Sequence, residues 1–273
     1  MLACSLAFAC SYAIAADRQI AITIDDLPAG AANSMSAAEI SQMTAKLLTP
    51  LREQKIPVVG FVNEKKLYKT GEVDDRIKAL NMWLDSGFEL GNHTFSHASL
   101  NRVGLKAWEE DVIQGETVTR MLLSQHNLKL RYFRHPYLDT GRDLQTRREA
   151  EAFLVDRGYR IAPVTLDAWD WMYAGVYDDA RKRGDTALQQ QLLSSYLSYT
   201  SFVYERGVRV FGKAIQRSDR LRTKTDSASA WQLAGSRPHQ RTARCDPQAR
   251  ISLHYLGRCI ERSGLQLTRR LHR

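Results

Sequence analysis

The apolar run Ile20-Ala21-Ile22-Thr23-Ile24 ends abruptly in two carboxylates, Asp25 and Asp26. Its β-branched residues are typical of a buried strand, which we expect to stop at Asp25. Four further strands are predicted along the chain, at residues 57–62, 88–90, 131–133 and 159–164.

Helices are predicted between and after these strands. The first begins after Ser36, because Ser36-Ala37-Ala38-Glu39 forms a capping box ahead of apolar residues at helical spacing. Other helices are expected over residues 74–86, 104–125, 144–156 and 185–210. This succession of βα units implies an α/β fold with a parallel sheet that is closed or nearly closed into a barrel.

Polar clusters follow the predicted strand ends. They are Asp25-Asp26, the histidine pair of Gly91-Asn92-His93-Thr94-Phe95-Ser96-His97, Arg134-His135-Pro136-Tyr137 and Asp167-Ala168-Trp169-Asp170-Trp171. In barrels of parallel strands the chemistry gathers at the carboxyl ends of the strands. We therefore expect the four clusters to meet on one face.

Two imidazoles and one carboxylate form a three-ligand set that leaves a divalent metal with open positions for water and substrate. The second carboxylate of the Asp25-Asp26 pair could take a proton from that water. Each cluster also has a purely structural interpretation: a helix cap for the aspartates, surface or core histidines, a salt bridge for Arg134 and a core aromatic for Trp171. Their occurrence in this order at strand ends favours the hydrolytic site.

These four clusters closely resemble the motifs of the polysaccharide deacetylases of the NodB-homology type, carbohydrate esterase family 4. The family patterns T-F-D-D, H-[ST]-x-x-H, R-x-P-[YF] and D-x-x-D-W match residues 23–26, 93–97, 134–137 and 167–171. The resemblance implies a distorted (β/α) barrel and metal-dependent removal of acetyl groups from N-acetylated sugars, as polymers or oligomers.

The resemblance also implies a metal set and a base. Asp26, His93 and His97 would bind a divalent metal, with zinc expected, and Asp25 would be the general base. A carboxylate beside a cation should be ionised at neutral pH, as a base must be. Each ligand histidine needs an acceptor for its second ring nitrogen, and the sequence does not identify it.

Other motif residues receive roles by the same resemblance. Arg134 would orient Asp25, and the backbone N–H of Tyr137 would stabilise the oxyanion. Pro136 and Trp171 would contact substrate, with Trp171 lining the pocket for the acetyl methyl group. Asp170 could orient a catalytic imidazole.

The family's fifth motif, an apolar strand ending in Leu-x-His, supplies the general acid, and no such strand follows Gln216. Ile251-Ser252-Leu253-His254 is a superficial match that lies late in the chain, so we do not expect His254 to be the acid. The barrel is therefore predicted to be incomplete at its C-terminal end.

The charge of the chain is concentrated in its last part. Residues 217–273 contain 13 Lys+Arg and 4 Asp+Glu, whereas the other residues are balanced, although the whole chain has a net charge of +9. The neutral body argues against a nucleic-acid partner. The basic tail has three explanations: a shifted reading frame, a disordered tail, or a basic arm for an anionic polymer, and we favour the first two.

The N-terminal residues 1–16 carry no charge and end in Ala13-Ile14-Ala15, which is typical of a secretory signal segment, although a buried strand or helix is the alternative. We expect an exported monomer with no transmembrane segment and a catalytic domain over residues 17–216. Three functions remain open: an N-deacetylase of peptidoglycan-like or chitin-like sugars, a catalytically impaired sugar-binding homologue, and an amidase or esterase for another acyl substrate.

Overall fold

A computed structural model of the protein describes residues 20–225, with side chains described as far as Gly207. Five parallel strands form one sheet in the order β1-β2-β3-β4-β5. They are β1 (Ile22–Leu27), β2 (Val58–Val62), β3 (Glu89–Asn92), β4 (Tyr132–Phe133) and β5 (Arg160–Ile161). The predicted α/β fold is confirmed, and it is consistent with the distorted barrel of carbohydrate esterase family 4. Within the described residues, β1 and β5 are the two edges of the sheet.

The two aspartates lie at an irregularity of β1. Ile24 pairs with Gly60 and Leu27 pairs with Val62, so the register of β1 against β2 shifts between them. Asp26 adopts a left-handed φ of 69° at this point. A bulge of this kind bends the strand and changes the direction of its side chains. Successive side chains of a regular strand point to opposite faces of the sheet, whereas the bulge lets the carboxylates of Asp25 and Asp26 lie at the same site.

Most predicted helices are confirmed. They are α1 (Ala37–Glu53), α2 (Val73–Asp85) and α6 (Leu144–Asp156). Four short helical elements lie elsewhere in the chain: η1 (Ala32–Ser34), η2 (Glu64–Leu67), α3 (Leu100–Val103) and η3 (Pro136–Leu138). The capping box is formed as predicted: the Ser36 side chain accepts the Glu39 N–H, and the Glu39 carboxylate accepts the Ser36 N–H. Local sequence signals were sufficient here because the cap is made within four residues.

The prediction of one helix over residues 104–125 is wrong. The structure has α4 (Leu105–Gln114) and α5 (Thr117–Gln125) instead. The break occurs where Gly115 lies against the loop after β3: a Cβ on Gly115 would lie 2.7 Å from the Phe95 nitrogen and 2.8 Å from the Thr94 carbonyl carbon. Asp111, in the last turn of α4, accepts the backbone N–H of Phe95 at 2.9 Å. Tertiary contact with the loop therefore interrupts a helical pattern that the sequence alone continues.

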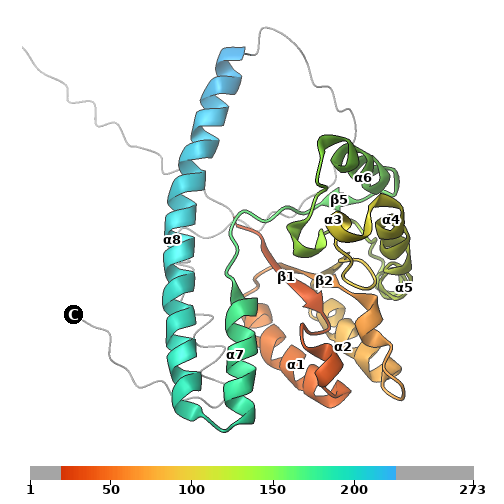
Figure 1. The fold of residues 1–273 in the computed structure, drawn as a ribbon, viewed down its shortest axis with the longest axis vertical. Helices are drawn as coiled ribbons and strands as arrows, with labels where there is room; N and C mark the ends of the chain where they lie inside the picture. Colours follow the sequence, from red (N-terminus) through yellow and green to blue (C-terminus); the bar gives the residue numbers. More distant parts are fainter. Residues whose placement is uncertain (1–19, 226–273) are drawn as a thin grey trace, which may run out of the picture.

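The chain after β5 also differs from expectation. The fifth strand is shorter than the predicted 159–164, and an unexpected helix, α7 (Asp170–Lys182), follows it. The predicted helix over 185–210 is longer, since α8 (Thr186–Thr225) continues past the expected boundary at Gln216. In Figure 1, α7 and α8 stand side by side, and α7 shares a groove with Ala31 and Ser34 around η1. The signal segment 1–16, most of the basic tail and His254 lie outside the described residues.

The core lies between the sheet and the helices that cover it. Trp83 of α2 and Trp108 of α4 are fully buried, and the Trp108 ring packs edge-on against Phe133 of β4 with centroids 5.4 Å apart. Burying a large aromatic side chain contributes about 2–3 kcal/mol. These residues anchor the helices on the strands that carry the polar clusters.

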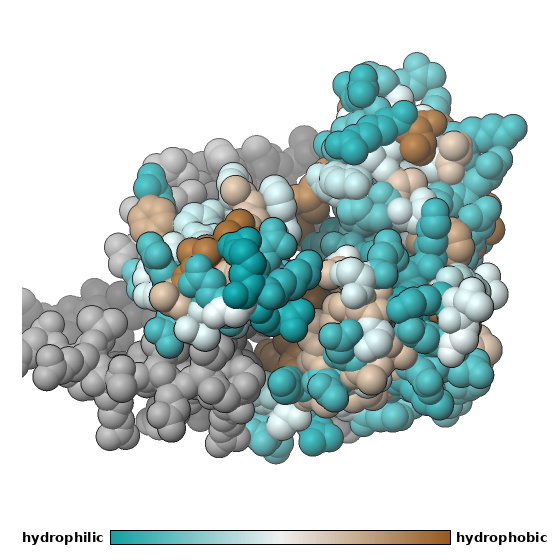
Figure 2. Space-filling model, turned by 60° about the horizontal axis from the view of Figure 1, so that its bottom comes forward, coloured by the Kyte–Doolittle hydropathy of each residue, from teal (hydrophilic) through white to brown (hydrophobic). Residues whose placement is uncertain are grey.

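Figure 2 shows a mostly hydrophilic face on which hydrophobic side chains form only small patches. No helix in the described part of the chain has the length and apolar character that crossing a membrane requires.

Candidate metal centre

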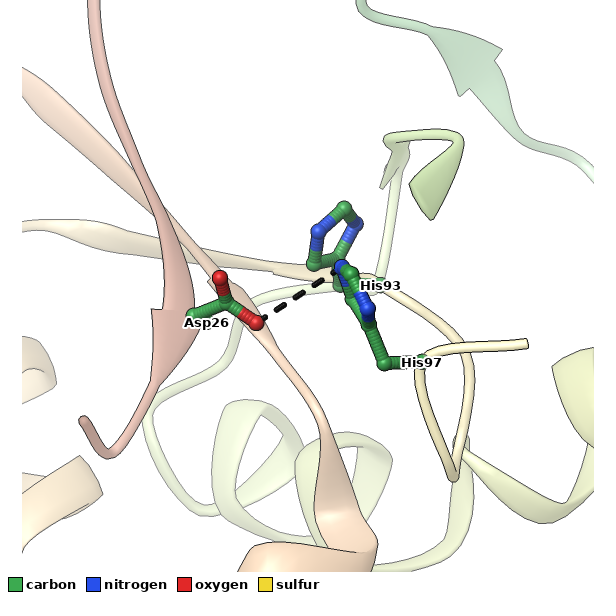
Figure 3. Close-up of side chains that lie close together, drawn as sticks. All are labelled: Asp26, His93 and His97. Atoms are coloured by element: carbon green, nitrogen blue, oxygen red, sulfur yellow. Dashed lines mark ion pairs between the residues drawn. The ribbon is translucent and has the colours of Figure 1, made fainter. Parts of the chain in front are cut away.

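Three predicted ligands come together in the structure. One potential ligand atom from each of Asp26, His93 and His97 lies within 4.8 Å of the other two. Asp26 comes from the bulge of β1, and the histidines come from the segment directly after β3 (Figure 3). The Nε2 atom of His97 lies 3.7 Å from Oδ1 of Asp26. The carboxyl ends of β1 and β3, which lie on either side of β2 in the sheet, therefore supply one set of donors, as the sequence predicted.

The loop that carries the histidines is held by specific hydrogen bonds. Thr94 and His97 have left-handed φ angles of 63° and 64°. The Asn92 side chain accepts the Thr94 N–H at 2.7 Å, and the Thr94 hydroxyl accepts the Ala98 N–H at 3.0 Å. The buried Asn63 amide donates to the carbonyl oxygen of His93. This loop geometry turns the imidazoles toward Asp26.

The structure identifies the partner of one ligand ring. His93 Nδ1 lies 2.8 Å from the backbone carbonyl oxygen of Arg134. This carbonyl can only accept, so Nδ1 carries the proton and Nε2 is left free as a ligand atom. Burial lowers the pKa of His93 to about 3. It also lowers the pKa of His97, and Asp26 only partly opposes this. Both rings are therefore neutral at pH 7, the state in which imidazole binds metal.

The donor set fits a divalent metal. Neutral imidazoles and a carboxylate are ordinary ligands for zinc and similar ions, with bonds of about 2 Å. Such bonds place neighbouring donors roughly 3.3 Å apart, so donors spread over 4.8 Å need only a modest contraction around one ion. Asp26 and His97 keep partial exposure, whereas His93 is buried. The set is thus anchored on one side and open on the other.

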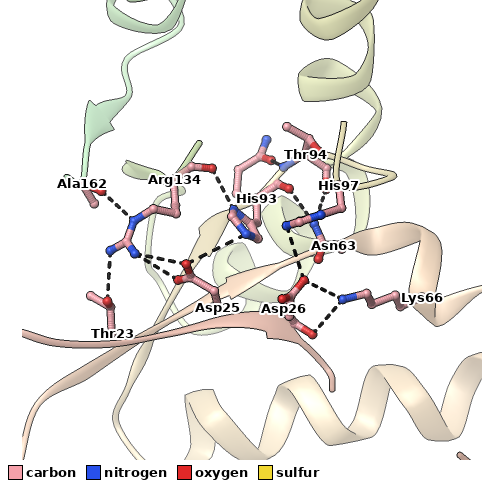
Figure 4. Close-up of polar contacts among 11 residues, drawn as sticks. Thr23, Asp25, Asp26, Asn63, Lys66, His93, Thr94, His97, Arg134 and Ala162 are labelled. Carbon is pink, nitrogen blue, oxygen red and sulfur yellow. Dashed lines mark hydrogen bonds and ion pairs between the residues drawn. The ribbon is translucent and has the colours of Figure 1, made fainter. Parts of the chain in front are cut away.

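Asp25, the expected base, is paired with Arg134 rather than with the three donors. Its Oδ2 lies 3.1 Å from Arg134 Nη1 and 4.0 Å from His93 Nε2 (Figure 4). Burial raises the pKa of Asp25 to about 6, the positive charge of Arg134 opposes that rise, and the neighbouring Asp26 adds to it. The carboxylate is therefore mostly ionised at pH 7.

Arg134 joins both edges of the sheet. Its Nε donates to the carbonyl oxygen of Ala162 at 2.6 Å, just after β5, and its Nη2 donates to the Thr23 hydroxyl of β1 at 3.0 Å. The side chain itself follows β4 and is almost fully buried. One guanidinium therefore connects three strands at the level of the site and fixes Asp25 between them.

Lys66 is a functional neighbour that the sequence reasoning missed. It lies in η2, and its Nζ is 2.7 Å from Oδ1 of Asp26 (Figure 4). Burial acts to raise the pKa of Asp26, but the charge and hydrogen bond of Lys66 outweigh it, so the pKa is lowered. A lysine after a strand has no spacing pattern that would have revealed this contact. Asn63, which holds the histidine loop, was missed for the same reason.

The third motif contributes residues around the donors. The Tyr137 ring packs on His97 with centroids 4.4 Å apart, and Tyr137 has a left-handed φ of 56°. Its exposed fraction is 55%. Pro136 is buried and begins η3. The structure therefore places Tyr137 at the rim of the donor set, while its predicted oxyanion role and the predicted substrate contact of Pro136 stay predictions.

The fourth motif is divided. The Asp170 carboxylate is close enough for its charge to raise the pKa of Asp25, as a smaller contribution than burial. In the described residues Asp170 hydrogen-bonds no histidine, so its orienting role is not seen here. Trp171 is 68% exposed on α7 and lines a groove with Ala31 and Ser34, away from the three donors. Its predicted contact with an acetyl group stays a prediction.

The polysaccharide deacetylase family model matches residues 14–155, more than half of the chain. The chain belongs to the polysaccharide deacetylase family. The match contains the aspartate pair, both histidines and the Arg134 motif.

Several solved structures resemble this deacetylase family member. A family 4 carbohydrate esterase from Streptomyces lividans in complex with acetate is 19% identical, with 58% of this chain and 70% of that chain covered and a TM-score of 0.40. The polysaccharide deacetylase from Bacillus cereus is 17% identical, with 67% of this chain and 74% of that chain covered and a TM-score of 0.42. A carbohydrate esterase family 4 pseudoenzyme from Bacillus anthracis is 16% identical, with 59% of this chain and 50% of that chain covered and a TM-score of 0.40. The chain spans about half the length of this pseudoenzyme. At such identities and TM-scores, the similarities say nothing about the substrate.

Proposed function

We propose that this chain is a metal-dependent hydrolase that removes N-acetyl groups from an N-acetylated polysaccharide or oligosaccharide of the peptidoglycan or chitin type. The observation that carries the proposal is the meeting of Asp26, His93 and His97 beside the paired Asp25. Membership of the polysaccharide deacetylase family supports the sugar substrate. We propose zinc as the metal because two imidazoles and one carboxylate suit it and leave coordination positions open.

Each residue of the site has a separate role in this reaction. A bound divalent metal supplies Lewis-acid chemistry, which activates water and polarises the amide carbonyl. Asp26, His93 and His97 would hold it. Asp25 accepts the proton of the attacking water at Oδ2, the oxygen that Arg134 Nη1 holds at 3.1 Å. The Tyr137 N–H donates to the oxyanion that develops on the substrate.

A second candidate is a catalytically impaired, sugar-binding homologue. The two other described histidines pack elsewhere: His135 is buried in a stack with Trp108, and the half-buried His126 lies near Asp85. Among residues 20–207, therefore, no third imidazole stands beside Asp25 and the donors to protonate a leaving amine. This observation favours slow or absent turnover with the metal site intact.

Acetate release from N-acetylglucosamine oligomers and from peptidoglycan fragments tests both candidates. A deacetylase releases acetate from at least one of them, and a chelator abolishes the release until zinc is restored. Binding of the oligomers without acetate release would support the impaired homologue. Release only from acyl amides or esters that contain no sugar would identify the chain as an amidase or esterase and reject the sugar substrate.

We also propose that the chain is exported, because residues 1–16 have the composition of a secretory signal segment. Expression of the full chain in a bacterium, followed by separation of periplasm from cytoplasm and N-terminal sequencing, tests this. Cleavage after Ala15 or Ala16 is expected. A cytoplasmic protein with an intact N-terminus would contradict it.

A further inference from the structure

The ammonium group of Lys66 lies at the candidate metal site itself. Its Nζ is 2.7 Å from Oδ1 of Asp26 and 3.3 Å from the backbone carbonyl oxygen of the same residue. The Lys66 side chain is only 15% exposed. The oxygen that it contacts is also the one that lies 3.7 Å from Nε2 of His97. A lysine and a ligand histidine thus approach the same carboxylate oxygen.

This lysine is held in place rather than free at the surface. The buried Arg76 donates to the carbonyl oxygen of Lys66 at 2.7 Å. Lys66 belongs to η2, which begins directly after β2 and Asn63. The backbone positions of Asp26, in β1, and of Lys66, just after the neighbouring strand β2, are therefore both fixed by the sheet. The ammonium cannot move far from Asp26 without leaving a partly buried carboxylate unpaired.

A fixed positive charge at this place acts against a second cation. A divalent ion bound by Asp26 would share its carboxylate with the ammonium and lie a few ångströms from it. Repulsion at such distances is substantial in a partly buried site. The same ammonium balances the Asp26 charge whenever no ion is bound, and it contacts both Oδ1 and the backbone carbonyl oxygen of this residue, whose φ is left-handed at 69°.

We propose that Lys66 is an internal counter-cation of the metal site, which keeps Asp26 in place without metal and lowers the affinity of the site for divalent ions. This inference rests on the proposed function, because it takes Asp26, His93 and His97 as the metal ligands. It makes Lys66 a residue that sets affinity rather than a ligand or a catalytic group. The site then exchanges its metal more readily than the three ligands alone would allow.

The test measures zinc affinity in the full chain by competition with a chromogenic chelator. The Lys66→Met variant keeps most of the side-chain length and removes the charge, so zinc should bind about tenfold more tightly than in the wild type. Lys65→Met is the matched control, because Lys65 is exposed one residue away and forms no ion pair in the described structure. Its zinc affinity should be unchanged.

A second readout uses thermal unfolding. Without zinc, Lys66→Met should unfold at a lower temperature than the wild type, and zinc should raise its unfolding temperature by more. Lys66→Gln provides an alternative if the methionine variant does not fold. Equal or weaker zinc binding by the Lys66 variants, beside a wild type that binds zinc, would overturn the counter-cation role alone. If the wild type does not bind zinc, the metal site and the proposed function are rejected together with it.

Discussion

The backbone carbonyl oxygen of Arg134 lies 2.8 Å from Nδ1 of His93, while the side chain of the same arginine lies 3.1 Å from the carboxylate of Asp25. One residue therefore orients a proposed metal ligand with its main chain and the expected base with its side chain. The relative position of His93 and Asp25 depends on where β4 ends.

Removal of either ligand histidine should abolish metal retention. The wild type should keep about one zinc per chain after dialysis, whereas His93→Ala and His97→Ala should keep almost none, because two protein ligands hold zinc too weakly. Elemental analysis of the dialysed proteins measures this. His126→Ala is the control, since the half-buried His126 lies near Asp85 and is not one of the three donors. A His97→Ala protein with full zinc content would show that His97 is not a ligand.

Asp25→Asn should separate binding from turnover. The amide cannot accept the proton of the attacking water, so acetate release should fall by about 10²–10⁴-fold while the zinc content stays unchanged. Acetate release and zinc content are measured on the same preparation. Asp74→Asn, an exposed carboxylate in the first turn of α2, should change neither. Undiminished turnover in Asp25→Asn would reject Asp25 as the base.

Arg134→Gln should destabilise the fold strongly. The substitution leaves Asp25 without its cation and removes the hydrogen bonds to Thr23 and Ala162, so the free energy of unfolding should fall by about 3 kcal/mol. Urea denaturation measures it. Arg131→Gln removes a more exposed pair with Glu89 and should cost less than about 1 kcal/mol. Similar losses in the two variants would mean that Arg134 does not connect the strands in solution.

His135 should make the fold sensitive to acid. Burial against Trp108 lowers its pKa to about 4, below the value of 6.5 expected in the unfolded chain. Its contribution is complete above pH 6.5 and is lost as the pH falls toward 4, because only the unfolded chain takes up the proton in this window. Between about pH 7 and pH 5 the loss should be about 2 kcal/mol.

Urea denaturation at both pH values compares the wild type with His135→Phe, which keeps an aromatic ring on Trp108 but cannot titrate. The variant should lose less stability on acidification. The same fall in both proteins would assign the acid sensitivity to other groups.

Features that depend on neighbouring residues in the chain could be predicted from the sequence. The strand ending at the aspartates and the Ser36 cap are of this kind, because apolar patterns and caps act over a few residues. The convergence of Asp26 with the histidines followed from the general rule that parallel strands present their carboxyl ends together.

Features set by contacts between distant segments could not be predicted. The Lys66 contact and the role of the Arg134 carbonyl depend on the register of β2 and β4, which no local pattern records. The helix α7 likewise begins within the fourth motif, and its course carries Trp171 away from the three donors.

Gly115 contributes no ligand, charge or hydrogen-bonding side chain, yet its lack of a Cβ allows the junction of α4 and α5 to pack directly on the loop between His93 and His97. A Cβ at this position would meet the backbone of Phe95 and Thr94 at less than 3 Å, so even Gly115→Ala must separate the α4–α5 junction from the loop. Any displacement of the loop changes the spacing between the imidazoles and Asp26. One methyl group at a position that supplies no donor can therefore alter the metal affinity of the proposed site.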